Sequence, residues 1–82
     1  MNQIVPIIAD RRAQVMSAER RAFLRLAVQQ RRQYWQYRKW ALEDEQAGNL
    51  PSYRKHMAEA ERLRRDAHWH LDRAKQSGAE YV

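Results

Sequence analysis

The sequence predicts an all-α protein: an antiparallel two-helix hairpin that pairs with a second copy to form a four-helix bundle. Glycine and proline, which interrupt helices, number only two each among 82 residues. The long segments between them consist mostly of Ala, Leu, Arg, Gln, Glu and Lys, which favour helices. The remaining observation is a turn signal at residues 47–52, AGNLPS. A short turn of this kind places two consecutive helices antiparallel.

The first helix is predicted over residues 10–47, preceded by an extended apolar arm at residues 1–9. The arm contains Pro6, which disfavours helical geometry in the residue before it. Asp10 is a suitable N-cap because its carboxylate can accept a hydrogen bond from an amide of the first turn. Ser17 is a second candidate for that position. The exposed aliphatic residues of the arm are expected to pack on the hairpin or on a partner.

The turn and the second helix follow from three residues. Gly48 suits the position after the first helix, where the backbone needs a left-handed conformation. Asn49 can cap the second helix, which is predicted over residues 51–77. Gly78 is expected to close that helix and to begin a short tail at residues 78–82. Residues 10–77 thus form the hairpin domain.

The apolar residues predict self-association, most simply as a dimer, or docking onto a larger protein. On the second helix they form one stripe: Tyr53, Met57, Ala60, Leu63, Ala67, Leu71 and Ala74. On the first helix they cover more than half of the circumference, which a single partner helix cannot hide. A hydrophobic core of this size is also marginal by itself. The residues expected to mediate a homodimer are Phe23, Leu24, Val28, Tyr34, Trp35 and Leu42.

The positive charge is concentrated on the first helix. The whole chain carries a formal charge of +6, and residues 11–39 alone contain nine basic residues and one acid. Arg21, Arg25, Arg32 and Lys39 fall within a narrow arc of the helix, and we call this set the basic ridge. Such a ridge can follow a phosphate backbone or face an acidic protein surface.

A second candidate contact lies on the second helix. Trp69 is expected opposite the apolar stripe, on a face shared with Arg62, Arg65 and Arg73. Arginines one or two turns away can stabilise an exposed indole through cation–π contacts. Tryptophan and arginine are also frequent anchors of protein interfaces. This face is therefore predicted to bind a protein or an unstacked base.

The composition argues against catalysis, metal binding and cofactors. The chain has no cysteine, and its few glycines form no phosphate-binding loop. His68 and His70 point about 200° apart on a helix, so they do not form a chelating pair. A two-helix hairpin offers no cleft for a catalytic pair of carboxylates. The one marked apolar run is too short to span a bilayer and lacks the basic flank of a secretory signal, so a cytoplasmic location is expected.

Two functions fit these features. The first is a non-catalytic adaptor or inhibitor that docks on an acidic protein surface, for example that of a nucleic-acid-processing enzyme. The alternative is a nucleic-acid-binding protein that uses the Arg, Gln and aromatic residues of the segment 29–40, QQRRQYWQYRKW. A purely structural assembly element is a third interpretation. Small size and high arginine content are typical of accessory proteins of phages or mobile elements.

Overall fold

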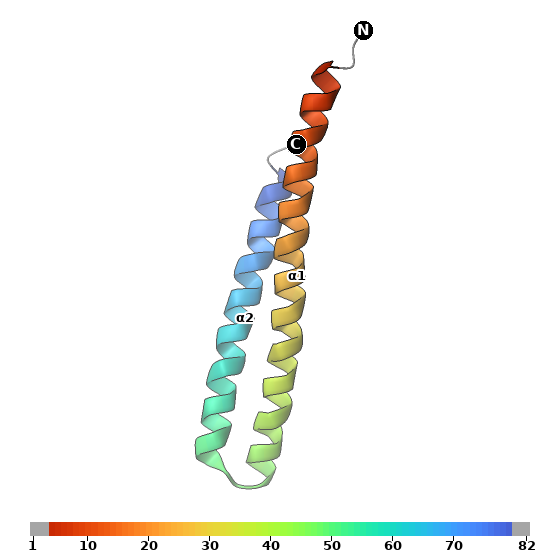
Figure 1. Ribbon diagram of the computed structural model, residues 1–82. Helices are drawn as coiled ribbons and strands as arrows, with labels where there is room; N and C mark the ends of the chain where they lie inside the picture. The colour runs from red at the N-terminus through yellow and green to blue at the C-terminus, as the bar shows by residue number, and fades with distance from the viewer. Residues whose placement is uncertain (1–3, 80–82) are drawn as a thin grey trace.

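The protein is a two-helix hairpin. The computed structural model describes the backbone of residues 4–79 and the side chains of residues 18–77. Helix α1 (Ile4–Gln46) and helix α2 (Leu50–Ala79) lie side by side and antiparallel, joined by a short turn (Figure 1). The molecule is a rod with extents of 72 × 14 × 13 Å, and α1 continues past the end of α2. The predicted all-α hairpin is confirmed.

The start of α1 differs from the prediction. The extended arm expected at residues 1–9 is wrong over residues 4–9, which are helical. Pro6 lies in the first turn of the helix, where backbone N–H groups have no intrahelical acceptor, so its missing N–H costs no hydrogen bond. Asp10 and Ser17 therefore lie inside α1 and not at its N-terminus. The packing expected of the arm falls outside the described side chains.

The turn has the predicted chemistry. Gly48 adopts a left-handed backbone with φ of 74°. Its N–H donates to the carbonyl of Glu45 (3.1 Å), and the N–H of Asn49 donates to the carbonyl of Asp44 (2.8 Å). These two bonds form a Schellman motif, which satisfies carbonyls at the end of α1. The side-chain Oδ1 of Asn49 accepts a hydrogen bond from the N–H of Ser52 (3.3 Å), so Asn49 caps α2 as expected.

The far end of α2 lies two residues beyond the prediction. The helix continues through Gly78 to Ala79, where residues 78–82 were expected to form a tail. One glycine near a helix end lowers helical stability by about 1 kcal/mol and need not stop the helix. Helix ends also shift by one or two residues with the definition used.

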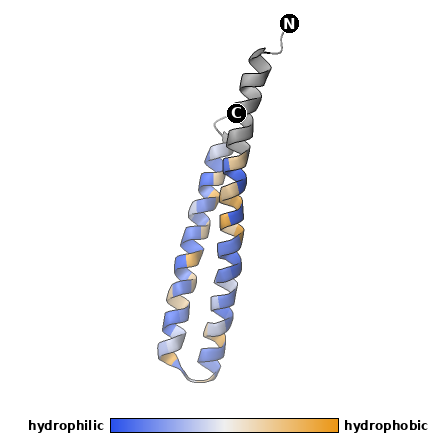
Figure 2. Cartoon of the chain, in the orientation of Figure 1, coloured by the Kyte–Doolittle hydropathy of each residue, from blue (hydrophilic) through white to orange (hydrophobic). Residues whose placement is uncertain are grey.

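Small residues form the contact between the helices. The buried residues among those described are Ala27, Ala41, Ala60, Leu63, Ala67, Ala74 and Ser77, and we call this set the alanine seam. Only Leu63 has a large side chain. The larger members of the predicted α2 stripe, such as Met57 and Leu71, are half-buried beside the seam. Hydrophilic residues dominate both helices outside it, with apolar patches between them (Figure 2).

Polar and aromatic pairs across the seam define the register. Near the open end, Phe23 stacks on His70 with ring centroids 6.0 Å apart. Gln30 Oε1 lies 2.7 Å from Nδ1 of His70. Near the turn, Asp44 Oδ2 lies 2.5 Å from Nδ1 of His56. His56 and His70 thus flank the seam.

Replacing Gly48 tests the turn. A Cβ at this position would meet no atom within 4 Å, so a side chain fits and only the positive φ opposes it. We expect Gly48→Ala to destabilise the hairpin by about 1–2 kcal/mol, measured by urea unfolding. Gly48→Asn should cost less, because asparagine tolerates the left-handed region. Equal stability of the alanine variant and the wild type would contradict this account of the turn.

Enlarging the seam tests the close approach of the helices. Ala60 is fully buried between them, and a leucine there would have to push them apart. We expect Ala60→Leu to lower the free energy of unfolding by about 1–3 kcal/mol. Ala58→Leu is the matched control, because Ala58 is exposed on the same helix. A neutral or stabilising Ala60→Leu would show that the seam has spare room.

Candidate interaction surface

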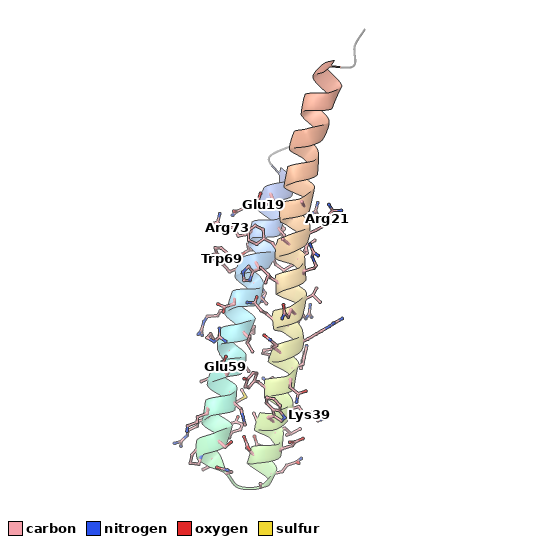
Figure 3. The ribbon with its side chains drawn as sticks, viewed as in Figure 1. Glu19, Arg21, Lys39, Glu59, Trp69 and Arg73 are labelled. Carbon is pink, nitrogen blue, oxygen red and sulfur yellow. The ribbon has the colours of Figure 1, made fainter. Side chains whose placement is uncertain are left out.

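The basic ridge lies on the outer side of the hairpin. Arg21, Arg25, Arg32 and Lys39 are all exposed. Figure 3 shows Arg21 and Lys39 projecting from the side of α1 that faces away from α2. None of the four makes an ion pair or a hydrogen bond with another described side chain. The structure thus keeps the four predicted residues together on one open face.

Two arginines of α2 are paired with carboxylates of the same helix. Arg62 pairs with Glu59 and with Asp66, the latter at 3.0 Å, and Arg64 pairs with Glu61 at 3.0 Å. The hydrogen bonds from Arg62 hold the pKa of Glu59 below its ordinary value. Exposed pairs of this kind add little stability. The other basic residues of α2 make no ion pair with a described side chain, so unpaired cations lie on both helices: the ridge on α1, and Arg54, Lys55, Arg65, Arg73 and Lys75 on α2.

The apolar residues predicted for self-association divide into two groups. Phe23, Leu24 and Tyr34 are half-buried. Phe23 packs within the hairpin, against His70 and Trp69. Three others stay open: Val28 is 52% exposed, Trp35 59% and Leu42 54%. We call Val28, Trp35 and Leu42 the outer apolar row.

A shallow groove joins Val28 of this row to the ridge. It runs along the outer face of α1 and is lined by Leu24, Arg25, Val28, Gln29, Arg32 and Gln33. Its lining mixes guanidinium, amide and aliphatic groups. Such a surface can form hydrogen bonds and ion pairs and can also bury apolar area.

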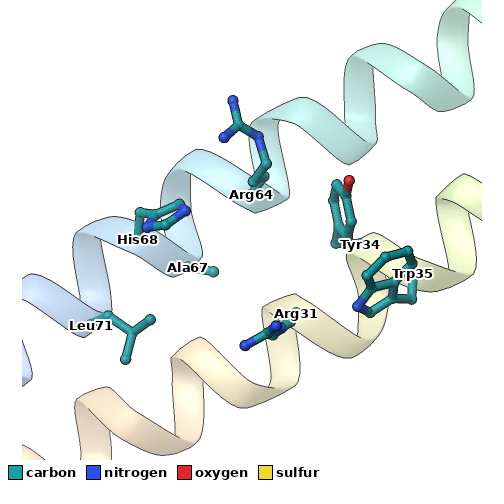
Figure 4. A pocket seen from close by; sticks show the side chains of 7 residues that line it. All are labelled: Arg31, Tyr34, Trp35, Arg64, Ala67, His68 and Leu71. Carbon is teal, nitrogen blue, oxygen red and sulfur yellow. The ribbon is translucent and has the colours of Figure 1, made fainter.

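A second groove lies between the two helices and was not predicted from the sequence. Figure 4 shows the side chains around it: Arg31, Tyr34 and Trp35 from α1, and Arg64, Ala67, His68 and Leu71 from α2. Trp35 therefore belongs both to the outer apolar row and to this inter-helix groove. Spacing along one helix could not indicate the groove, because its lining comes from both helices.

The helical wheel suggested that Trp69 lies opposite the apolar stripe, but the structure places its ring against the other helix. Its ring packs edge-on against Phe23 of α1, with centroids 6.3 Å apart, because a large indole reaches past the narrow seam. The predicted cation–π contact is present, with the guanidinium carbon of Arg73 at 4.8 Å from the ring centroid (Figure 3). Arg65 is exposed, while Arg62 is engaged by carboxylates. Trp69 remains 52% exposed and so has a partly structural role.

A polar cluster joins the helices beside the turn. Ser52 Oγ donates a hydrogen bond to Asp44 Oδ2 (2.8 Å), and His56 Nδ1 lies at the same oxygen. The hydrogen bond from His56, assisted by that from Ser52, lowers the pKa of Asp44 below its ordinary value of 3.8 against the opposing effect of burial. The exposed Arg54 and Lys55 lie near the acidic run 43–45 in the sequence and make no ion pair with Asp44. Asp44 instead uses Ser52 and His56, which lie closer to the seam.

Two features are absent from the described part of the chain. It contains no group of three or more His, Asp or Glu side chains arranged to hold a metal ion. In the same residues, neither helix has a stretch that is both long and apolar enough to cross a membrane.

Comparison of the chain with models of known families, with curated proteins and with solved structures found no match.

The turn cluster predicts a pH-dependent contribution to stability. The pKa of Asp44 is lower in the folded chain than in the unfolded chain, so its ionised form stabilises the hairpin. This contribution is complete above the unfolded pKa of about 3.8 and is lost as the pH falls through the folded value. We expect Asp44→Asn to lower Tm at about pH 5, with the difference shrinking toward about pH 2.5.

Thermal unfolding followed by circular dichroism measures this effect. Glu45→Gln is the control, because it removes a neighbouring exposed carboxylate that has no side-chain partner among the described residues. A Tm difference for Asp44→Asn that stays constant over this pH range would contradict the role given to the carboxylate.

Proposed function

We propose that this protein is a non-catalytic interaction protein, a helical-hairpin adaptor or inhibitor that docks on an acidic surface of another protein. The observation that supports this best is the outer face of α1. There the uncompensated basic ridge lies beside the exposed outer apolar row. No described carboxylate pairs with the ridge: Glu19 lies at its open end without forming an ion pair, and the other described carboxylates lie toward the turn or on α2.

The apolar row favours a protein over a nucleic acid as the partner. A phosphate backbone compensates arginine charge but offers no surface that would bury Val28, Trp35 and Leu42. A protein surface can do both, and the cores of protein interfaces are enriched in Trp and Arg. Burying exposed aliphatic and aromatic groups contributes roughly 25 cal/mol per Å² of apolar area.

One observation favours the nucleic-acid alternative. The ridge extends from Arg21 to Lys39, which corresponds to about 27 Å along a helix. Gln29 and Gln33 line the same groove as Arg25 and supply neutral donors and acceptors. A straight basic face of this length can contact several phosphates. Binding of that kind would fall steeply with salt.

The test is a pull-down with the tagged full chain, with and without nuclease treatment. We expect the wild type to retain an acidic protein after nuclease treatment. The ridge variant Arg25→Gln/Arg32→Gln/Lys39→Gln should lose at least about tenfold of that retention, because each cation facing an acidic interface contributes to binding.

The matched control is Arg54→Gln/Lys55→Gln/Lys75→Gln. It removes the same number of exposed positive charges from α2 and leaves the ridge intact. Equal losses in both variants would mean that only net charge matters and would contradict the docking proposal. Retention that disappears with nuclease treatment would favour the nucleic-acid alternative.

A further inference from the structure

Trp35 has an unusual set of neighbours. On a helix, the residues three and four positions away on either side are the ones that surround a side chain. For Trp35 these are Arg31, Arg32, Arg38 and Lys39, and all four are basic and exposed. None of them pairs with a carboxylate among the described residues. The indole is therefore an exposed apolar centre within a ring of four cations.

The outer apolar row runs along α1 parallel to the alanine seam. Val28, Trp35 and Leu42 are spaced by seven residues, so they lie about 10.5 Å apart along α1. Val28 and Leu42 each follow a buried alanine of the seam, Ala27 and Ala41. A row with this period keeps its direction relative to a helix packed against it, which is the pattern found in coiled coils.

The row opens onto the groove between the helices. Trp35 lines that groove together with Leu71, Arg31, Arg64 and His68 (Figure 4). No carboxylate lines it. Among the lining residues, Arg64 forms an ion pair with a carboxylate, that of Glu61, which is outside the lining. An occupant would thus contact both helices and meet apolar surface in the centre and positive charge on both sides.

We propose that this surface, the outer apolar row with its flanking cations and the groove beside it, binds an acidic amphipathic helix as a third helix of the bundle. The proposal rests on the proposed function and specifies the acidic surface. The partner helix would place apolar residues at heptad spacing against Val28, Trp35 and Leu42. Its flanking positions would carry Asp or Glu facing the cations around Trp35.

A second copy of the chain fits this surface poorly. Two copies packed through their outer apolar rows would bring both rings of cations around Trp35 together. Like charges facing each other at an interface disfavour association. The acidic residues that could relieve this repulsion, Glu43 and Glu45, lie at one end of α1, away from Trp35.

The proposal is tested with a designed peptide and the full chain. The probe is a fluorescein-labelled helical peptide of three heptads, with Leu at positions a and d and Glu at e and g. Its control is a peptide of identical composition whose order is scrambled so that no apolar face remains. Binding is measured by fluorescence anisotropy at several salt concentrations, and stoichiometry by sedimentation.

We expect one peptide to bind per chain, at least about tenfold more tightly than the scrambled control. Trp35→Ala should weaken binding at least about tenfold. Trp69→Ala, which removes an indole of similar exposure from the other face, should change binding less than threefold. Val28→Glu/Leu42→Glu, at two exposed positions, should abolish binding without changing the helical circular dichroism signal.

Three outcomes would overturn the proposal. Equal binding of both peptides would mean that charge alone attracts them. Loss of binding in Trp69→Ala but not in Trp35→Ala would place the site on the other face. A homodimer that dissociates on Val28→Glu/Leu42→Glu would make this row a self-association surface.

Failure here is distinguishable from failure of the proposed function. If the ridge still captures an acidic protein while neither peptide binds, the docking function stands and the helical form of the partner is wrong. If the ridge variant captures that protein as well as the wild type does, the docking function itself is wrong.

Discussion

The close approach of the two helices at the alanine seam determines most of what the surface looks like. Alanine and serine side chains fill the contact, and Leu63 is the one large residue fully within it. A seam this narrow has no space for an indole or a long aliphatic chain. The large apolar residues are therefore placed at its edges, either half-covered, as at Phe23, or open, as at Trp35. The short distance between the helices thus explains both why small residues pack between them and why large apolar residues are exposed beside them.

The electrostatics follow from the same arrangement. Carboxylates are interspersed with the arginines of α2, and Arg62 and Arg64 form local pairs with them. On α1, residues 18–42 contain one acid, Glu19, and their cations form no such pairs. Both helices thus carry a net positive charge, and they differ in that local arginine–carboxylate pairs form on α2 and not within residues 18–42 of α1. An acidic partner that docks on α1 therefore meets cations that are not already paired.

The sequence predicted the hairpin well because its signals are local. Gly48 and Asn49 mark the turn through their own backbone preferences, and the seven-residue spacing of Ala60, Ala67 and Ala74 marks the seam. The prediction failed at Pro6, where the position within the helix mattered more than the residue type. It also misplaced Trp69, because a helical wheel has no information about how far a side chain reaches across to a neighbour. The inter-helix groove required both helices at once.

The two ends of the hairpin differ in how far apart along the chain their partners lie. Beside the turn, Asp44 contacts Ser52 and His56, which follow it by 8 and 12 residues in the sequence. Phe23 and Trp69 are also in contact, but they lie much further apart in the sequence. Closing a short loop costs less conformational entropy than closing a long one. The two helices are therefore expected to pair first beside the turn and then toward the open end. They are expected to separate first at the open end, where Phe23 contacts Trp69. A ligand bound in the groove at Trp35, which lies between the turn and the open end, would reduce this separation of the helices without touching the open end.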